Sequence, residues 1–443
     1  MSPKKNNKQR VAGLPVRAGA LFLLRAVLER QQPLDDTLSQ SLASSPMGDL
    51  APRDLGFVRA IASSVLRRLG QIDAVLDKFM QKPLPLRANG VRHILRIGAA
   101  ELLFLKTPPH AAVSVALALA ETEKGLAPYK ALINAVLRRI SREGERQIKK
   151  GAGPIANIPD WMVSGWNDQF GAATAQAIAA ALCEEAELDI SCSGDAEQWA
   201  EKLGGRLLPT GSVRVNSSGR IDALPGFEEG AWWVQDAAAA LPVRLLGPVA
   251  DKDVLDLCAA PGGKTMQLVA SGARVTAVDR SKNRLKRLEQ NLERLHFNAE
   301  TIVADLVKWQ PERRWSHILL DAPCTATGTA RRHPDVLHLK HQEDIGRLAA
   351  LQKSILDRVV DWLEPGGILV FCTCSLEAAE GPEHVQKFLQ QNANMEHVPI
   401  EAAEIADQSD FVTAQGDLRT LPCHWSGDGG VDGFFSARFR RTF

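Results

Sequence analysis

The chain has 443 residues, of which 45% are hydrophobic and 24% charged, and its formal net charge is +1. This length predicts about three domains, and the composition is that of a soluble globular protein rather than a disordered or fibrous one. The longest apolar stretch is far shorter than the roughly 20 residues that span a bilayer, and the seven cysteines form no C-x-x-C pair. We therefore expect a cytoplasmic protein without a membrane partner or a metal site.

Charge is distributed unevenly along the chain. Residues 1–150 carry 25 Lys and Arg against 12 Asp and Glu, whereas the remainder carries 28 basic and 40 acidic residues. Clustered positive charge on one segment is typical of a nucleic-acid partner, although a solvated helical face would give the same pattern.

The first part of the chain is predicted to be helical throughout. Apolar residues recur at positions i, i+3, i+4 and i+7 in residues 91–102, and again at Ile133, Val136, Leu137 and Ile140. We assign residues 8–145 to an all-α domain.

Two further domains follow a basic run and a Gly-Ala-Gly-Pro break at residues 151–154. Residues 155–247 mix helical and short strand-like patterns, which indicates a small α/β linking subdomain. Residues 248–443 alternate short apolar runs with helical stretches, as expected for a parallel sheet with crossover helices. The predicted fold class is α/β for this last domain.

Five apolar runs of the last domain each end in a chemically distinctive residue. In an open parallel sheet, ligands bind beyond the carboxyl ends of the strands. A single carboxylate after a strand is more often a helix cap, but five such ends at one edge favour a site. The residues that follow the runs are Cys258, Asp279, Asp305, Asp321 and the Cys372-Thr-Cys374 segment.

The loop CAAPGGK at residues 258–264 gives the strongest signal. Its Pro-Gly-Gly turn between a strand and a helix allows close backbone approach and presents N–H groups to an anionic ligand. A P-loop would need glycine at Cys258, and the dinucleotide fingerprint G-x-G-x-x-G is absent. S-adenosylmethionine, an adenosine ligand with a carboxylate and no pyrophosphate, fits better. Asp279 then lies near the ribose hydroxyls, and Asp305 accepts from the adenine amino group.

These motifs resemble a known family. CAAPGGKT, AVD with RLKRLEQNLERL, ILLDAPCTATG and TCS, in this order, are similar to the RNA (cytosine-5) methyltransferases of the RsmB/Fmu (Sun) family. RHILRIGAAELLFL, TPPHAAVSVALALAE and KALINAVLRRI resemble the RNA-binding fold of NusB, and IPDWMVSGWNDQFG, RVN and VQD resemble the family's linking subdomain. The resemblance implies a class I (Rossmann-like) methyltransferase domain preceded by a NusB-like RNA-binding domain.

The resemblance also implies residue roles. Cys374 is the nucleophile that adds to carbon 6 of cytosine, Cys324 assists resolution of the adduct, and Asp321 stabilises the ring during attack. Cys372 is expected in the core. The residues implied to bind S-adenosylmethionine are Cys258, Ala259, Ala260, Pro261, Gly262, Gly263, Lys264, Asp279, Asp305 and Asp321.

Two segments are harder to interpret. The family's Pro-Glu-Glu-Asn stretch is replaced by LEAAEG at residues 376–381, which leaves the role of the acidic residues there open. The basic residues 331–333 are expected to grip RNA phosphates rather than supply His333 as a base.

The resemblance implies methylation of small-subunit (16S) ribosomal RNA, and we expect the protein to be monomeric. Two alternatives stay open: a transfer RNA cytosine-5 methyltransferase, and a non-catalytic NusB-like RNA-binding or antitermination factor.

Overall fold

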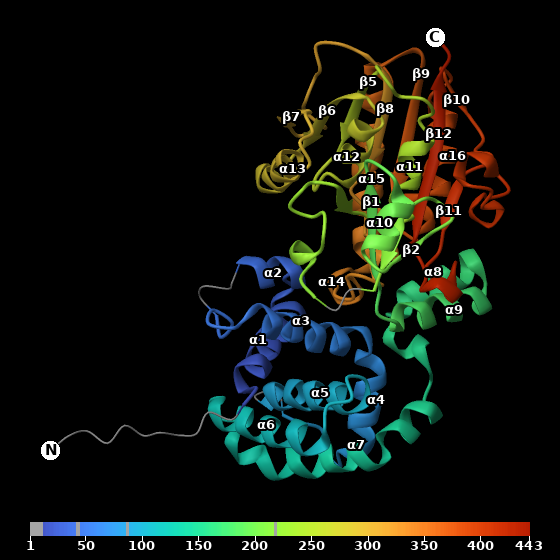
Figure 1. Cartoon of the computed structure of the whole chain (residues 1–443). Coiled ribbons are helices and arrows are strands. Elements are labelled where there is room, and N and C mark those ends of the chain that lie inside the picture. Colours follow the sequence, from blue (N-terminus) through green and yellow to red (C-terminus); the bar gives the residue numbers. More distant parts are fainter. Residues whose placement is uncertain (1–11, 41–44, 86–87, 217–218) are drawn as a thin grey trace. The chain divides into compact units, whose positions relative to one another are not determined.

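The computed structural model describes residues 12–40, 45–85, 88–216 and 219–443, and the chain divides into two units (Figure 1). The first unit reaches Asp160 and also contains His333–Leu339; the second contains Trp161–Arg332 and Lys340–Phe443. The chain therefore leaves the second unit after Arg332 and returns to it at Lys340. Among the described helices, none combines the length and the apolar character needed to cross a membrane.

Helices build the first unit around one apolar core, as predicted. In its last long helix Ile133, Val136, Leu137 and Ile140 are all buried, which confirms the face read from their spacing. A proline stands in the first turn of α1, α3 and α6, where its fixed φ suits a helix start. The helices are α1 (Leu14–Arg30), α2 (Leu34–Gln40), α3 (Pro52–Arg67), α4 (Leu69–Phe79), α5 (Asn89–Leu103), α6 (Pro109–Thr122), α7 (Lys130–Lys150) and α14 (Val336–Leu339).

The segment His333–Leu339 packs on the helices of the first unit although its sequence lies within the last predicted domain. The Asp335 carboxylate accepts the N–H of Leu34 at 2.9 Å and so caps the start of α2. His338 donates from Nε2 to the Leu66 carbonyl at 2.8 Å, and Leu337 is buried. The domain boundaries at 145, 155 and 248 stay a prediction.

This cap gives a local test. Asp335→Ala removes the acceptor of the Leu34 N–H, and a cap is worth about 1 kcal/mol, so exchange of that amide should accelerate roughly fivefold. Hydrogen exchange followed by mass spectrometry of the peptide containing α2 measures the change. Asp49→Ala, at an exposed turn residue of the same unit, serves as the control. Equal exchange in both variants would contradict the capping role.

The second unit begins with a small antiparallel sheet in the order β2-β3-β1-β4. The buried residues Ile190, Val213, Val215 and Trp232 form a core on one side of this sheet. Its strands are β1 (Leu188–Cys192), β2 (Arg206–Leu207), β3 (Val213–Val215) and β4 (Trp232–Val234). Along the chain, α8 (Asp160–Phe170) and α9 (Ala172–Cys183) precede β1, α10 (Ala196–Lys202) lies between β1 and β2, and α11 (Leu241–Arg244) follows β4.

A large mixed sheet in the order β10-β12-β9-β8-β5-β6-β7 forms the rest of this unit. β7, β6, β5, β8 and β9 are mutually parallel, and β12 runs antiparallel to β9. All five predicted apolar runs lie in these parallel strands, and the Rossmann-like fold class is confirmed. Their carboxyl ends meet at one edge because parallel strands share a direction.

Helices separate β5, β6 and β7 from one another, β8 from β9, and β9 from β10 (Figure 1). The strands are β5 (Asp253–Leu257), β6 (Arg274–Asp279), β7 (Glu300–Val303), β8 (Trp315–Asp321), β9 (Leu363–Thr373), β10 (Met395–His397), β11 (Leu418–Thr420) and β12 (Phe434–Arg441). The helices are α12 (Gly263–Ala270), α13 (Lys282–Arg294), α15 (Gln342–Trp362) and α16 (Pro382–Gln391).

Candidate active site

The glycine loop between β5 and α12 contains two glycines, and only the first occupies a position that excludes a side chain. Gly262 has a φ of +110°, and a side-chain carbon there would meet Met266 and Leu288 at 2.6 and 2.9 Å. Gly263 opens α12, and a carbon there would meet nothing closer than Gln235 at 3.7 Å. The backbone N–H groups at the start of α12 are therefore not crowded, and they favour an anionic group.

A buried hydrogen bond fixes the start of α12 to β5. Thr265 Oγ1 donates to Asp256 Oδ2 at 2.6 Å, and both residues are completely buried. Burial raises the pKa of Asp256 to about 7, so the carboxyl group is partly protonated at neutral pH. This hydrogen bond thus fixes the helix that follows the glycine loop to the strand that precedes it.

The two carboxylates after β6 and β7 occupy different surroundings. Asp279 is buried: Oδ1 accepts the N–H of Ser281 at 2.8 Å, and Oδ2 accepts the N–H of Ala260 at 3.2 Å. Asp279 therefore ties the end of β6 to the glycine loop. Asp305 is exposed, and its Oδ1 accepts the N–H of Val307 at 3.1 Å. Both carboxylates thus organise their own turns, in addition to any ligand contact.

The structure brings the two predicted catalytic cysteines together. Cys324 follows β8 and Cys374 follows β9, and their sulfur atoms lie 3.4 Å apart. The backbone holds this approach, because the Cys374 carbonyl accepts the N–H of Gly328 at 3.0 Å. The hydrogen bond to Cys374, together with burial, raises the pKa of Cys324 well above its ordinary value. Cys324 therefore keeps its proton at neutral pH.

Lys264 connects the glycine loop to the end of β8. Its Nζ donates to Asp321 Oδ2 at 2.9 Å, and its side chain is only 8% exposed. Burial alone would lower the pKa of Lys264, but the charge of Asp321 and the hydrogen bond to it raise the pKa above the ordinary lysine value. A charged lysine thus lies among the reactive groups.

Cys372 is buried, as expected, yet it lies close to this ion pair. Its sulfur is 3.5 Å from Asp321 Oδ1, and burial raises its pKa well above the ordinary value. Cys258 is also protonated at neutral pH, because burial and the charge of Asp279 raise its pKa. Neither thiol is suited to act as a nucleophile.

Comparison with known proteins identifies the family of this chain. Residues 243–440 match the family described as 16S rRNA methyltransferase RsmB/F, and residues 14–142 match the NusB family. The ribosomal RNA small subunit methyltransferase B of Cronobacter sakazakii is 33% identical over 402 residues, covering 85% of this chain and 90% of that protein. The chain belongs to the RsmB/F family of methyltransferases. As an RsmB/F methyltransferase it is an enzyme, so the non-catalytic alternative is wrong.

Solved structures share the fold of this RsmB/F chain. PH0851 superposes with a TM-score of 0.76 at 21% identity, covering 98% of this chain and all of that one. NSun6 from Pyrococcus horikoshii, solved with SFG, gives a TM-score of 0.55 at 22% identity, covering 64% of this chain and 98% of that one. At these identities the likeness extends to the fold.

Glu380, whose role was left open by sequence reasoning, lies next to both predicted catalytic cysteines of this RsmB/F chain. It is completely buried, and its carboxylate accepts the N–H of Thr325 at 3.0 Å and the hydroxyl of Ser375 at 2.6 Å. Gln352 Nε2 donates to it at 3.2 Å. Glu380 therefore joins the residue after Cys324 to the residue after Cys374. The segment LEAAEG, which replaces Pro-Glu-Glu-Asn, thus still supplies a buried carboxylate that bonds both cysteine loops.

Loss of this bridge should release the two cysteine loops from each other. We expect Glu380→Ala to lower the methyl-transfer rate about 100-fold, because displacement by about 1 Å has effects of this size. The rate at saturating RNA and methyl donor measures the effect, and the exposed Glu383→Ala provides the control. A rate within about threefold of the wild type would show that the loops do not need the bridge.

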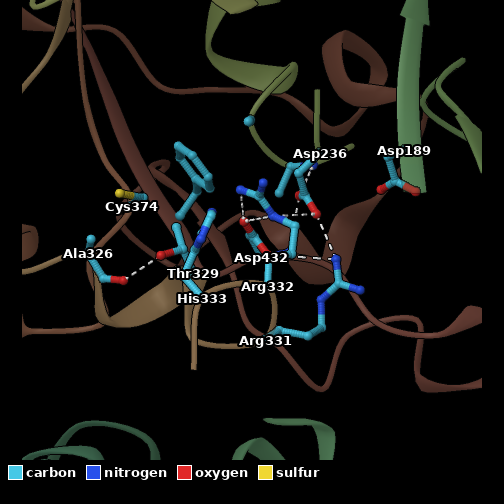
Figure 2. Close-up of polar contacts among 12 residues, drawn as sticks. Asp189, Asp236, Ala326, Thr329, Arg331, Arg332, His333, Cys374 and Asp432 are labelled. Atoms are coloured by element: carbon cyan, nitrogen blue, oxygen red, sulfur yellow. Dashed lines mark hydrogen bonds and ion pairs between the residues drawn. The ribbon is translucent and has the colours of Figure 1, made fainter. Parts of the chain in front are cut away.

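The expectation that residues 331–333 all grip RNA phosphates is wrong for Arg331. Its side chain is 1% exposed, and it donates to Asp236 Oδ2 at 2.7 Å and to the Gly429 carbonyl at 3.0 Å. His333 lies in the first unit, with Nδ1 3.3 Å from Asp35 Oδ2. Arg331 is thus a structural cation that holds the loop after Cys324 (Figure 2).

Proposed function

We propose that this chain transfers a methyl group from S-adenosylmethionine to carbon 5 of a cytosine in small-subunit (16S) ribosomal RNA, through a covalent bond between Cys374 and the cytosine. The observation that carries the proposal is the 3.4 Å approach of Cys324 and Cys374 beside the Lys264–Asp321 pair. The names of the relatives support the substrate, since they are ribosomal RNA small subunit methyltransferases.

The glycine loop fits the methyl donor. Position 262 requires glycine because of its backbone conformation and its close neighbours. The uncrowded start of α12 suits the donor's carboxylate. Residues 258–264 and Asp321 would line the methionine end, Asp279 would accept from the ribose hydroxyls, and Asp305 from the adenine amino group. When bound, the donor supplies an electrophilic methyl group on a sulfonium. The P. horikoshii NSun6 structure was solved with SFG, which is consistent with such a ligand.

The two thiols have separate tasks in this proposal. Carbon 5 of cytosine is a weak nucleophile, and addition of the Cys374 thiolate to carbon 6 makes it enamine-like, so that it can take the methyl group. Water or another base then removes the proton from carbon 5, and the electrons of that C–H bond re-form the double bond between carbons 5 and 6 as Cys374 leaves as a thiolate. Cys324 keeps its own proton and lies 3.4 Å away, so it can donate a hydrogen bond to the departing Cys374 sulfur.

Asp321 and Lys264 prepare the base for attack. Addition at carbon 6 moves electrons toward the ring nitrogen and carbonyl, and a carboxylate beside the ring stabilises its protonated form. Lys264 fixes Asp321 Oδ2 at 2.9 Å. The pair thereby holds an oriented carboxylate within the site.

Transfer of a tritiated methyl group to small ribosomal subunits, naked ribosomal RNA and transfer RNA tests the substrate. We expect product on small-subunit RNA, at one cytosine that a deletion strain leaves unmethylated. Product on transfer RNA alone would replace the ribosomal assignment with the transfer RNA alternative. The basic first unit is proposed to bind the RNA.

A further inference from the structure

Arg332 is held rigidly by one buried carboxylate. Its Nε donates to Asp432 Oδ2 at 2.7 Å, and its Nη2 donates to the same oxygen. Asp432 is itself completely buried, and its N–H donates to Asp236 Oδ1 at 3.1 Å. Arg332 thus has a fixed position, with little side-chain freedom left to lose when it binds a ligand.

Arg332 differs from its neighbour Arg331 in what it presents to solvent. The Arg332 side chain is 31% exposed, against 1% for Arg331, while the Asp236 and Asp432 side chains are fully buried. Within the part of the chain that the structure describes, no hydrogen bond to Arg332 Nη1 is found. The two anions of this cluster are therefore paired within it, and Arg332 is its only member with a substantially exposed side chain.

Arg332 lies near the proposed nucleophile. The Gly433 N–H, next to Asp432, donates to the Gly328 carbonyl at 2.8 Å, and the Gly328 N–H donates to the Cys374 carbonyl at 3.0 Å. In the view of Figure 2, Arg332 and Asp432 lie on the side of the cluster toward Cys374.

We propose that Arg332 binds a backbone phosphate of the RNA next to the target cytidine. The proposal rests on the proposed function, which brings an RNA strand to Cys374. A guanidinium is planar, permanently charged and suited to phosphate oxygens, and here one of its edges is anchored while Nη1 is available. A fixed cation beside the nucleophile would set the position of the target nucleotide without reading its base.

Three variants test the role of Arg332. Arg332→Gln removes the cation, Arg332→Lys keeps it, and Arg440→Gln removes an exposed cation paired with Glu396 near the opposite end of β12. For a short single-stranded target RNA, we expect Arg332→Gln to weaken binding at least tenfold in low salt. It should also reduce the slope of log affinity against log salt by about 0.7. Arg332→Lys should restore the slope, and Arg440→Gln should match the wild type.

Two further measurements separate this role from others. Replacing single phosphates beside the target cytidine by neutral methylphosphonates should weaken wild-type binding at one position and have no further effect in Arg332→Gln. The pH profile of Cys374 alkylation should be the same in both proteins. An unchanged salt slope with a shifted alkylation profile would instead make Arg332 a partner of the thiol, and would overturn the proposal.

The methylphosphonate series tests the proposal even if Arg332→Gln fails to fold, because the series can be measured with the wild-type protein. If no phosphate beside the target cytidine matters to wild-type binding, the inference is wrong even though methylation proceeds. Failure of the proposed function has a different signature, since the wild type would then methylate none of the RNAs offered.

Discussion

Replacing Cys374 by alanine should abolish methyl transfer, with a loss of roughly 10⁴-fold or more, as expected when a nucleophile is removed. Replacing Cys324 by alanine should instead allow attack on cytosine but slow release of the thiolate. The half-buried Cys374 and its 3.4 Å distance from Cys324 place one thiol to attack and the other to assist its departure. A covalent protein–RNA species should therefore accumulate only in Cys324→Ala, as a shifted band on a denaturing gel.

The pattern across variants decides the assignment. Cys192→Ala, on β1 of the small sheet, should behave as the wild type, because burial raises the pKa of this thiol to about 11. A double variant lacking Cys324 and Cys374 should form no covalent species. An adduct in Cys374→Ala, with none in Cys324→Ala, would reverse the roles of the two thiols.

Asp321→Ala should be costly for both stability and activity, since it leaves the charge of Lys264 without its partner in a site where the lysine is 8% exposed. Breaking a fully buried ion pair by removing one member destabilises a protein by roughly 3 to 5 kcal/mol, and the 32% exposure of the Asp321 side chain lowers the expected loss to about 2 kcal/mol. If Asp321 stabilises the ring during attack, the transfer rate should fall by about 10² to 10³ as well. Urea unfolding and single-turnover kinetics measure the two effects.

A surface pair of the same unit supplies the matched control. Asp253 pairs with Arg274 at 2.8 Å, but both side chains are at least one-third exposed, so Asp253→Ala should cost at most about 1 kcal/mol. Lys264→Met combined with Asp321→Ala should recover stability without recovering activity. Equal stability losses in Asp321→Ala and Asp253→Ala would show that the Lys264–Asp321 pair is not a buried one in solution.

The elements of the catalytic fold could be predicted from the sequence because their signals are local. Each parallel strand is one short apolar run, and the glycine loop is set by Gly262, whose conformation other residues rarely adopt. The face of α7 could be predicted for the same reason. The family could be identified from motifs whose order along the chain is specific to that family.

Contacts between distant loops could not be predicted in this way. Glu380 accepts hydrogen bonds from both Thr325 and Ser375 only because the loops after β8 and β9 fold side by side. The sequence around Glu380 contains no pattern that predicts these contacts. Arg331 looks like a surface cation until Asp236 and Asp432 are seen around it.

The segment His333–Leu339 shows the same limit at the level of domains. Its residues lie within the range 248–443 that we assigned to the methyltransferase domain, and no local pattern indicates that Asp335 caps α2 in the helical unit. The same holds for the site: Cys324 and Cys374 could be predicted to lie there from the sequence, whereas the groups that hold them in place are visible only in the fold.

The most direct measurement is to digest the covalent species of Cys324→Ala with nuclease and protease and to locate the attached nucleotide by mass spectrometry. The account predicts a cytidine bearing one added methyl group, bonded through carbon 6 to the sulfur of Cys374. A nucleotide attached to any other residue, or RNA that becomes methylated without ever being bonded to the protein, would contradict it.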